Sequence, residues 1–390
     1  MDKILITGFP YVRDRYFATF RDSSIRDEVV FLLPRRWTAK GGSVVFTPPH
    51  DERVTTATAL FHHSHVPLIG GLLKGWMPAF PLVLWRMRHS VSLVYTCSEP
   101  TLLTTLYQAV WARVLGKRHI CFTWENISYA RKLSLVSRMV HEGILRLVLA
   151  LSDGLICGNE AGLRLHRPYS NIPMEVIPMN GVDVAFFAPH ATTRRMFRGQ
   201  DMSEKLVVSF IGAIGKRKGL DALVLAFARL VQSVPHAQLV IAGSGEYDAE
   251  LARRIEEAGI SRSVTRHAWL DDMGVRDLLS VSDVFVYPSI EYGGWAEQFG
   301  YSMAEAMSMQ VPVVSTRTGS IADVVRDQET GILVAPANVQ ELTQALERLA
   351  RDPELIGRLG MAGRRDVESR FGHQVIAQRF KNFFRRVSMV

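Results

Sequence analysis

The sequence has few cysteines and little compositional bias. Only three of its 390 residues are cysteine, and no two of them form a CxxC pair, so we expect neither a disulfide framework nor a zinc site. All three lie in apolar stretches, which favours a reducing compartment. The chain also lacks low-complexity tracts and short repeats. With 47% hydrophobic and 22% charged residues, it is not expected to be a largely disordered protein.

Signatures of several nucleotide- and nucleic-acid-binding classes are missing as well. The segment ITGFPY stands where a GxGxxG would follow the first predicted strand, which argues against a dinucleotide-dependent oxidoreductase. No GxxxxGK[ST] phosphate loop occurs. The basic residues lack the interleaved aromatic residues of a nucleic-acid platform, so no nucleic-acid partner is expected.

Neither a signal peptide nor a spanning helix is expected. The run MDKILITGF is too short for a signal peptide and has no cleavage site, so we expect a cytoplasmic protein. The most apolar stretch, residues 66–85, approaches the ~20 residues that span a bilayer, but it contains Lys74 near its centre and three prolines. We expect a broken apolar segment of a soluble domain. The alternative is a peripheral patch at the inner face of the membrane, supported by Arg86, Arg88 and two flanking tryptophans.

Positive charge is concentrated in the first half of the chain. Residues 1–200 contain 24 Lys and Arg against 14 Asp and Glu, whereas residues 201–390 contain 22 against 24. A basic half suggests acidic lipid head groups, a phosphorylated substrate or nucleic acid as the partner. The alternative is a surface that is basic without a particular partner.

The length predicts two domains, and the order of elements predicts their class. Continuous apolar strands alternate with helices, which predicts α/β architecture with two doubly wound Rossmann-like domains whose strands end at a shared cleft. We expect domains over residues 1–190 and 205–372, a linker over 191–204, and a helix over 373–390 that packs on either domain. Predicted strands cover residues 3–7, 29–33, 93–96, 118–123, 154–157, 175–177, 206–211, 238–242, 264–269, 284–287, 311–315 and 332–334.

The strongest candidate site is the strand, loop and helix in YPSIEYGGWAEQFGYSMAEAM. The first amides of this helix, at Phe299, Gly300 and Tyr301, have no partners within the helix and can point at an anion. Glu305, in the second turn, could accept both hydroxyls of a ribose, and Glu297 would face a group beyond the phosphates. This arrangement suits a substituted nucleotide diphosphate. The alternative is a solvent-facing Glu297 and a capping Glu305.

A second segment of the same kind, FIGAIGKRKGL, contains three adjacent cations. Its strand ends at Gly212 and its helix opens at Gly219, an order typical of a phosphate cradle. We predict that Lys218 neutralises the diphosphate, because a compact charge there would stabilise a departing nucleotide. We expect Lys216 and Arg217 to be solvated.

Three further segments are weaker candidates. In AGSGE, Gly243 and Gly245 would let a base or ribose approach the backbone, although such turns are common after a strand. Glu99 follows a strand in the first half and is a candidate acceptor contact. A cluster of histidines lacks an acidic or cysteine partner at a supporting spacing, so we expect no metal site there. These histidines are His62, His63 and His65.

Together these segments resemble the donor domain of glycosyltransferase family four, which has the GT-B fold. The features match in order over about residues 150–385. They are the NGVD segment with its later Phe and Pro, the G…KG loop, the G.G turn and the run PS…W.EQFG…EAM…PVV. The first half is similar more loosely, in SDGLICGNEAG and in the strand before TWEN.

The resemblance implies a retaining, metal-independent glycosyltransferase without a cofactor. The first domain would bind the acceptor, a saccharide or lipid-linked glycan of envelope or polysaccharide biosynthesis, and the second a UDP- or GDP-linked sugar. Lys218 would bind the diphosphate, Glu305 the ribose and Glu297 the hydroxyls of the donor sugar. Residues 299–301 would supply amides near the sugar and phosphate.

This sequence departs from the family pattern in three places. Ala213 stands where members usually have Arg, so more of the diphosphate binding would rest on Lys218. TWEN replaces a Thr-x-His-type motif, so Glu125, as a catalytic group, or Asn126 would face the reacting sugar. GFP replaces the usual glycine pair after the first strand.

Two other interpretations stay open. A non-catalytic nucleotide-sugar binder, motivated by Ala213 and the missing histidine, would bind nucleotide without turnover. An epimerase or hydrolase on the same scaffold would consume the donor with no acceptor present.

Overall fold

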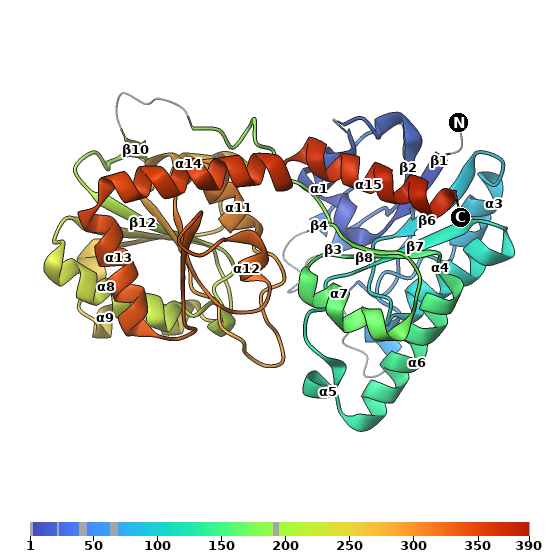
Figure 1. Cartoon of the computed structure of the whole chain (residues 1–390), viewed down its shortest axis with the longest axis horizontal. Coiled ribbons are helices and arrows are strands. Elements are labelled where there is room, and N and C mark those ends of the chain that lie inside the picture. The colour runs from blue at the N-terminus through green and yellow to red at the C-terminus, as the bar shows by residue number, and fades with distance from the viewer. Residues whose placement is uncertain (1–2, 22, 39–44, 63–68, 190–194, 390) are drawn as a thin grey trace. The chain divides into compact units, whose positions relative to one another are not determined.

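The computed structural model describes residues 3–21, 23–38, 45–62, 69–189 and 195–389, and the chain divides into two compact units (Figure 1). The first unit contains residues 1–181 and 373–390, and the second contains residues 182–372. The boundary therefore lies earlier than residue 190. Of the predicted linker, residues 191–194 fall outside the described ranges. The rest includes a short antiparallel pair within the second unit, β10 (Met196–Phe197) and β11 (Gln200–Asp201).

The first unit is built on a parallel sheet with the strand order β5-β2-β1-β6-β7-β8-β9. The chain moves outward from β1 to one edge and then returns to β6, so the order reverses between β1 and β6. The strands are β1 (Lys3–Thr7), β2 (Val29–Pro34), β5 (Val54–Ala57), β6 (Val91–Thr96), β7 (Arg118–Thr123), β8 (Gly154–Cys157) and β9 (Met174–Val176).

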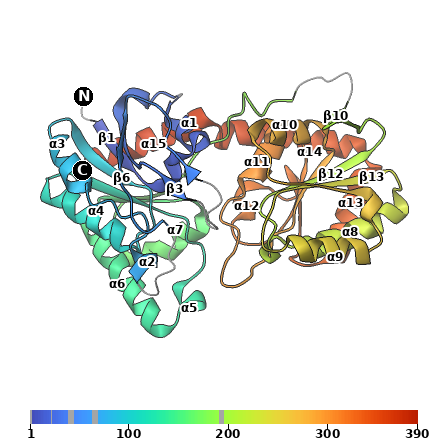
Figure 2. The same ribbon diagram turned by 180° about the vertical axis from the view of Figure 1, so that it is seen from behind.

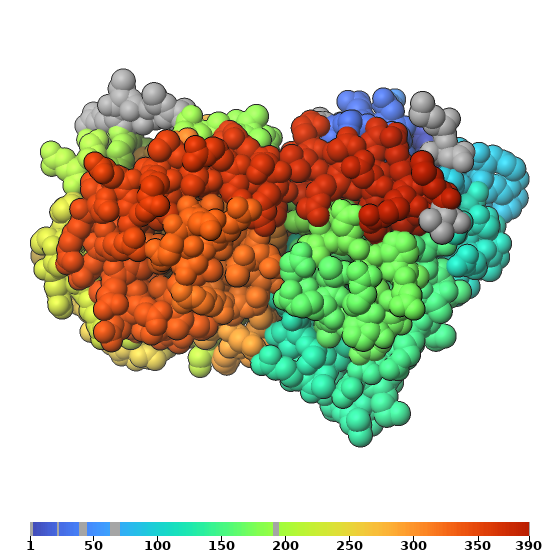
Figure 3. Space-filling view, in the orientation of Figure 1, coloured from blue at the N-terminus to red at the C-terminus, as the bar shows by residue number. Residues whose placement is uncertain are grey.

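Helices cover both faces of this sheet because its strands are apolar on both sides. In β1, Ile4 and Ile6 join the core beneath α1 (Asp14–Arg21) and α15 (His373–Ser388), whereas Leu5 joins the core beneath α3 and α4. In the space-filling view the outer side of α15 lies on the surface of this unit (Figure 3). The other helices are α2 (Ile69–Leu72), α3 (Phe80–Arg86), α4 (Leu103–Val114), α5 (Tyr129–Lys132), α6 (Leu135–Leu151) and α7 (Glu160–His166). A small antiparallel pair joins β3 (Trp37–Thr38) to β4 (Val45–Phe46).

The apolar stretch over residues 66–85 is interrupted, as its prolines predict. Residues 66–68 lie outside the described ranges, α2 ends at Leu72, and α3 begins at Phe80 with Pro81 in its first turn, where proline is tolerated. None of the helices in the described ranges is long and apolar enough to cross a membrane.

The second unit has a parallel sheet of order β14-β13-β12-β15-β16-β17, with its reversal between β12 and β15. Its strands are β12 (Leu206–Ile211), β13 (Ala237–Ala242), β14 (Val264–His267), β15 (Val284–Tyr287), β16 (Val313–Thr316) and β17 (Gly331–Val334). Its helices are α8 (Leu220–Ser233), α9 (Asp248–Glu257), α10 (Asp272–Val281), α11 (Tyr301–Ser308), α12 (Ile321–Val324), α13 (Val339–Arg351) and α14 (Pro353–Arg370).

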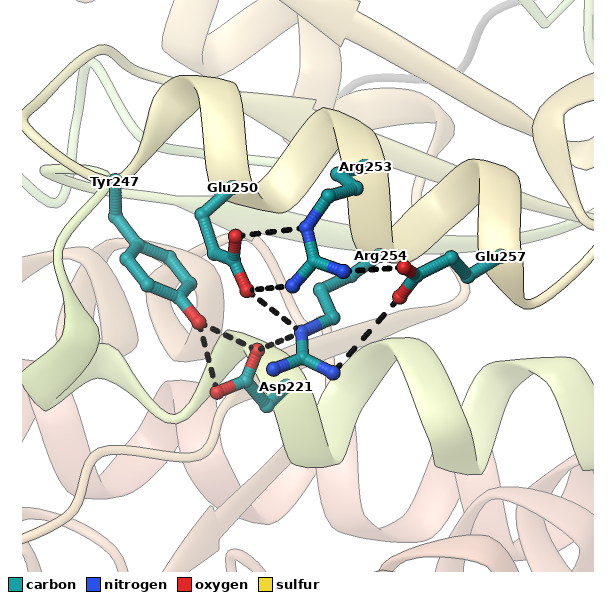
Figure 4. Close-up of polar contacts among 6 residues, drawn as sticks. All are labelled: Asp221, Tyr247, Glu250, Arg253, Arg254 and Glu257. Carbon is teal, nitrogen blue, oxygen red and sulfur yellow. Dashed lines mark hydrogen bonds and ion pairs between the residues drawn. The ribbon is translucent and has the colours of Figure 1, made fainter.

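A polar network fastens α9 to the start of α8 (Figure 4). The Tyr247 hydroxyl donates to both carboxylate oxygens of Asp221, at 2.8 and 2.9 Å. Glu250 accepts from Arg254 at 2.9 Å and also pairs with Arg253. Because Asp221 lies in the first turn of α8, this network holds the β13–α9 loop beside the loop that opens α8.

Two fully buried histidines in the first unit are held by neutral partners. His119 Nε2 lies 3.0 Å from the Thr96 hydroxyl and its Nδ1 lies 2.8 Å from the Ser152 hydroxyl. His166 Nε2 lies 3.0 Å from the Tyr129 hydroxyl. Burial lowers the pKa from 6.5 to about 3 for His119 and to about 4 for His166, because the charged ring would lose its hydration.

Acidification is therefore expected to destabilise the first unit well above the range in which most carboxylates titrate. Both histidines have a depressed folded-state pKa, so their contribution is complete above pH 6.5 and is lost as pH falls toward 4 and 3. Below pH 6.5 each histidine should lower the free energy of unfolding by about 1.4 kcal/mol per pH unit, which is roughly 2 kcal/mol at about pH 5. Urea unfolding at about pH 7.5 and 5 measures this. The double variant His119→Gln/His166→Gln should show a flatter pH dependence, and an unchanged slope would contradict the assignment.

Candidate functional site

Two loops of the second unit meet at the carboxyl ends of the adjacent strands β12 and β15. The first loop runs from Gly212 through a 3₁₀ turn over Lys216–Lys218 to α8, and the second runs from Tyr287 to α11. The backbone N–H of Ile290 donates to the Arg217 carbonyl at 2.9 Å and joins the loops directly. In doubly wound sheets, ligands bind where the strand order reverses, and these loops lie at that position.

Lys218 is the best-defined cation of the site. The residue is 4% exposed, and its ammonium donates to Glu297 Oε2 at 2.5 Å and to the Tyr287 hydroxyl. The Ser289 hydroxyl donates to the same Glu297 oxygen at 3.2 Å. Burial lowers the pKa of Lys218, and the Glu297 carboxylate opposes that shift. The site thus brings the predicted diphosphate ligand and the predicted sugar contact into one buried ion pair.

Aromatic rings surround this pair. The Lys218 ammonium lies 4.3 Å from the centroid of the Tyr287 ring and 5.2 Å from that of Trp295. Arg217 stacks on Trp295 at 3.8 Å, and exposed Lys216 lies 5.2 Å from the ring of Tyr292. Lys216 is thus exposed, as expected, whereas Arg217 is half-buried against Trp295, and ring contacts hold both cations near the site.

The helix α11 begins later than the sequence predicts, so of the three predicted amides only that of Tyr301 belongs to the helix. Gly300 adopts φ 80° as its N-cap, and Tyr301 is the first helical residue. The Phe299 ring is buried against Tyr301 and Phe371, at 4.6 and 5.2 Å between centroids. Glu297 and Glu305 are 6% and 4% exposed, so the alternative of a solvent-facing Glu297 is wrong. A buried carboxylate needs polar partners, and a ribose contact by Glu305 stays a prediction.

The glycines of the neighbouring loops pack backbone against backbone. Gly212 N–H donates to the Ala242 carbonyl and Ile214 N–H to Ser244, both at 3.0 Å. A Cβ at Gly243 would lie 1.8 Å from the Gly212 carbonyl oxygen. Loop packing therefore accounts for the glycine at this position, and a ligand contact at Gly243 or Gly245 stays a prediction.

The candidate residues of the first unit gather at the carboxyl ends of β6 and β7. Both Glu99 oxygens accept hydrogen bonds, one from the Thr123 hydroxyl at 2.6 Å and one from the Trp124 N–H at 2.8 Å. Burial raises the pKa of Glu99. Glu125 accepts from the Ile127 N–H at 3.2 Å and pairs with Lys132. Glu99 thus orders the segment that holds Glu125 and Asn126.

The structure adds residues that the sequence analysis did not single out. Tyr287, Ser289 and Trp295 contact the Lys218 and Glu297 side chains, although all three lie in the run quoted above. In the sequence Tyr287 looks like a further apolar strand residue, so only its contact with Lys218 identifies it as part of the site. His62 bonds to Thr38 and Ala59, while His63 and His65 lie outside the described ranges. Within those ranges no three His, Cys, Asp or Glu residues are grouped as metal ligands would be.

The sequence of this chain is similar to a known family and to several glycosyltransferases. The profile of the family described as Glycosyl transferases group 1 matches residues 193–366. A D-inositol 3-phosphate glycosyltransferase from Kribbella flavida is 30% identical over 337 residues, 79% of this chain and 76% of the relative. A GDP-mannose-dependent monoacylated alpha-(1-6)-phosphatidylinositol monomannoside mannosyltransferase from Corynebacterium glutamicum is 29% identical over 224 residues, 56% of each chain. The chain thus spans about half the length of that relative and of a similar Mycolicibacterium smegmatis mannosyltransferase.

Solved structures share the fold at low sequence identity. The Anabaena protein HepE, in complex with UDP, has a TM-score of 0.75 at 17% identity, covering 99% of this chain and 100% of HepE. Sucrose-phosphate synthase from Thermosynechococcus elongatus has a TM-score of 0.76 at 19% identity, covering 99% of each chain. These similarities confirm the predicted fold class, with two Rossmann-like domains of GT-B type. By its similarity to the Kribbella flavida relative and its matched donor-domain segment, this chain belongs to the Glycosyl transferases group 1 family.

Proposed function

We propose that this protein is a retaining glycosyltransferase that moves a sugar from a nucleotide diphosphate sugar to an acceptor hydroxyl. The observation that carries the proposal is the buried Lys218–Glu297 pair, at 2.5 Å, beside the start of α11. A buried ion pair is seldom retained for stability alone, because desolvation offsets most of its attraction. Its place at the strand reversal suits a ligand that is both anionic and hydroxylated.

Each side chain of the site has a separate role in the proposed reaction. The bond from the anomeric carbon to the phosphate oxygen breaks, and the nucleotide diphosphate leaves with the electron pair. Two of the three Lys218 N–H groups donate to Glu297 and Tyr287, which leaves the third for a phosphate oxygen. In this proposal the Gly300 and Tyr301 amides would bind the same charge. Glu297 holds the sugar hydroxyls, and Glu305 the ribose.

The acceptor step needs no separate base in this proposal. The acceptor oxygen attacks the anomeric carbon from the face that the diphosphate leaves, so configuration is retained, and its proton passes to the departing phosphate. Glu125 or Asn126 would orient the acceptor. The Corynebacterium glutamicum relative is named for a GDP-mannose donor and a phosphatidylinositol-linked acceptor, so GDP sugars and lipid-linked saccharides are the first to test.

A thermal-shift screen with UDP, GDP, ADP and their sugar conjugates tests the donor site. One diphosphate at about 100 times its Kd should raise the unfolding midpoint by roughly 5–10 °C in the wild type. The shift should be lost in Lys218→Ala and in Glu305→Ala, each measured against its own nucleotide-free midpoint. Folded wild type that responds to no nucleotide would contradict the proposal.

Turnover assays with the identified donor then separate the alternatives. Transfer requires both donor loss and a glycosylated acceptor, with the α or β configuration of the donor kept in the product. Donor loss with no acceptor present would indicate a hydrolase or epimerase. Binding with no turnover across an acceptor panel would favour a non-catalytic binder.

A further inference from the structure

Exposed apolar side chains are concentrated on one layer of the first unit. Among the described residues nineteen large hydrophobic side chains are exposed, and nine of them lie on α3, α4 and α6. These helices line one edge of the unit, with α4 packed against both α3 and α6 (Figures 1 and 2). The nine are Leu82, Trp85, Val110, Val114, Leu135, Val136, Met139, Val140 and Leu147. Clustered exposure of this kind marks an interaction surface.

The most exposed of these side chains form a ridge along α6. We define the α6 ridge as Leu135, Val136, Met139, Val140 and Leu147, of which the first three are 72%, 73% and 67% exposed. The opposite side of α6 already supplies the core with residues such as Leu145 and Val148. Core packing therefore accounts for one side of this helix and leaves the ridge unexplained. Figure 1 shows the N-terminal end of α6 projecting beyond the sheet of its unit.

The segment that contains the ridge is rich in cations. Residues 101–150 contain seven Lys and Arg and only two acids. Both acids are paired, Glu125 with Lys132 and Glu142 with Arg138 at 2.7 Å and Arg146 at 3.6 Å. Asp153, just beyond this segment, pairs with Arg118 at 2.7 Å and Arg113 at 4.0 Å, so cations exceed acids by seven to three over residues 101–153. The basic residues of this segment are Arg113, Lys117, Arg118, Arg131, Lys132, Arg138 and Arg146.

This charge pattern discriminates between occupants of the ridge. A second copy of the chain, joined across a two-fold axis, would place the same cations opposite one another. A bilayer with anionic head groups would meet them with opposite charge, while the apolar side chains enter the interface. We propose that the α6 ridge, together with the cations of residues 101–150, docks this protein on the surface of an anionic bilayer.

The α6 ridge is a different surface from the membrane patch that the sequence suggests. Residues 66–85 were expected to be a broken apolar segment of a soluble domain, with a membrane patch as the alternative. Of their large side chains only Leu82 and Trp85 are exposed among the described residues of that stretch. These two lie on α3, at the border of the layer, where Arg88 stacks on Trp85 at 4.3 Å. Docking by the ridge needs no nucleotide or turnover, so it stands or falls independently of the proposed transferase activity.

Vesicle sedimentation of the full chain tests the proposal. Binding is expected to vesicles of phosphatidylcholine with phosphatidylglycerol, to weaken with added salt, and to be much weaker with phosphatidylcholine alone. The triple variant Leu135→Ser/Val136→Ser/Met139→Ser should lower the bound fraction roughly tenfold or more. The matched control, Trp269→Ser/Met273→Ser, changes side chains that are 65% and 50% exposed in the second unit and should bind as the wild type does. Circular dichroism and the unfolding midpoint check that each variant is folded.

Three outcomes would overturn the proposal. One is folded wild type that sediments with neither kind of vesicle. A second is a triple variant that is folded yet binds as well as the control. The third is a dimer that forms without lipid and is lost in the triple variant, with no vesicle binding, which would assign the ridge to a second copy.

Discussion

Replacing Lys218 by methionine is expected to lower kcat/KM for sugar transfer by roughly 10²–10³-fold, the usual cost of removing one preorganised donor to a developing anion. The ammonium is buried beside Glu297, where water screens it poorly, so no mobile cation would replace it. The measurement is initial rate against donor concentration, with the nucleotide sugar that stabilises the wild type. Lys216→Met, which changes an exposed cation two residues away, should keep most of the activity.

Stability must be separated from chemistry in this test. Lys218→Met leaves the Glu297 carboxylate buried without its cation, which should cost about 3–5 kcal/mol of unfolding free energy. The double variant Lys218→Met/Glu297→Leu removes both charges and should recover most of that stability without recovering activity. If activity returned with stability, Lys218 would be a structural residue and not a ligand of the diphosphate.

Gly219→Ala is expected to destabilise the second unit by at least about 4 kcal/mol and to abolish nucleotide binding. Gly219 has φ 65°, and a Cβ there would lie 2.0 Å from the Pro288 carbonyl oxygen. That oxygen belongs to the backbone of the β15 loop, so it can yield only if the loops at the site separate. Urea unfolding and the nucleotide-induced thermal shift measure the two effects.

Gly259 supplies the matched control, because its φ is 68° and nothing lies within 4 Å of its Cβ position. Gly259→Ala should therefore lower the free energy of unfolding by only about 1–2 kcal/mol, because alanine is strained in the left-handed backbone conformation, and it should leave nucleotide binding intact. Equal losses for the two variants would mean that loop contact at Gly219 contributes nothing beyond its backbone angle.

Much of the fold follows from local sequence pattern. The predicted strands over residues 3–7, 118–123, 154–157, 206–211 and 284–287 coincide with β1, β7, β8, β12 and β15, because each is an apolar run bounded by polar or turn residues. β5 (Val54–Ala57) was missed, since it lies at the sheet edge and its VTTA sequence is half polar. Edge strands bury less surface, so their sequences contain less signal.

The sequence allowed the residues of the candidate site to be predicted, but not the contacts between them. Lys218, Glu297 and Glu305 could be chosen from their loops and from the family resemblance. Their arrangement could not, because Lys218 and Glu297 are 79 residues apart and meet only once β12 and β15 pair. The same limit applies to Glu99, whose two oxygens accept from Thr123 and Trp124, contacts that the sequence did not indicate.

The return of α15 to the first unit has a consequence for biosynthesis. Phe380, Phe383 and Phe384 complete the core on one face of the first sheet, with Phe380 packing 5.1 Å from Phe20 and 5.6 Å from Tyr95. A nascent chain that has just emerged through residue 181 therefore holds an apolar face with no cover. The second unit, a single continuous stretch, has its whole core before that cover arrives. The first unit is therefore synthesised as two separate segments, and its core is completed only after the whole second unit has been synthesised.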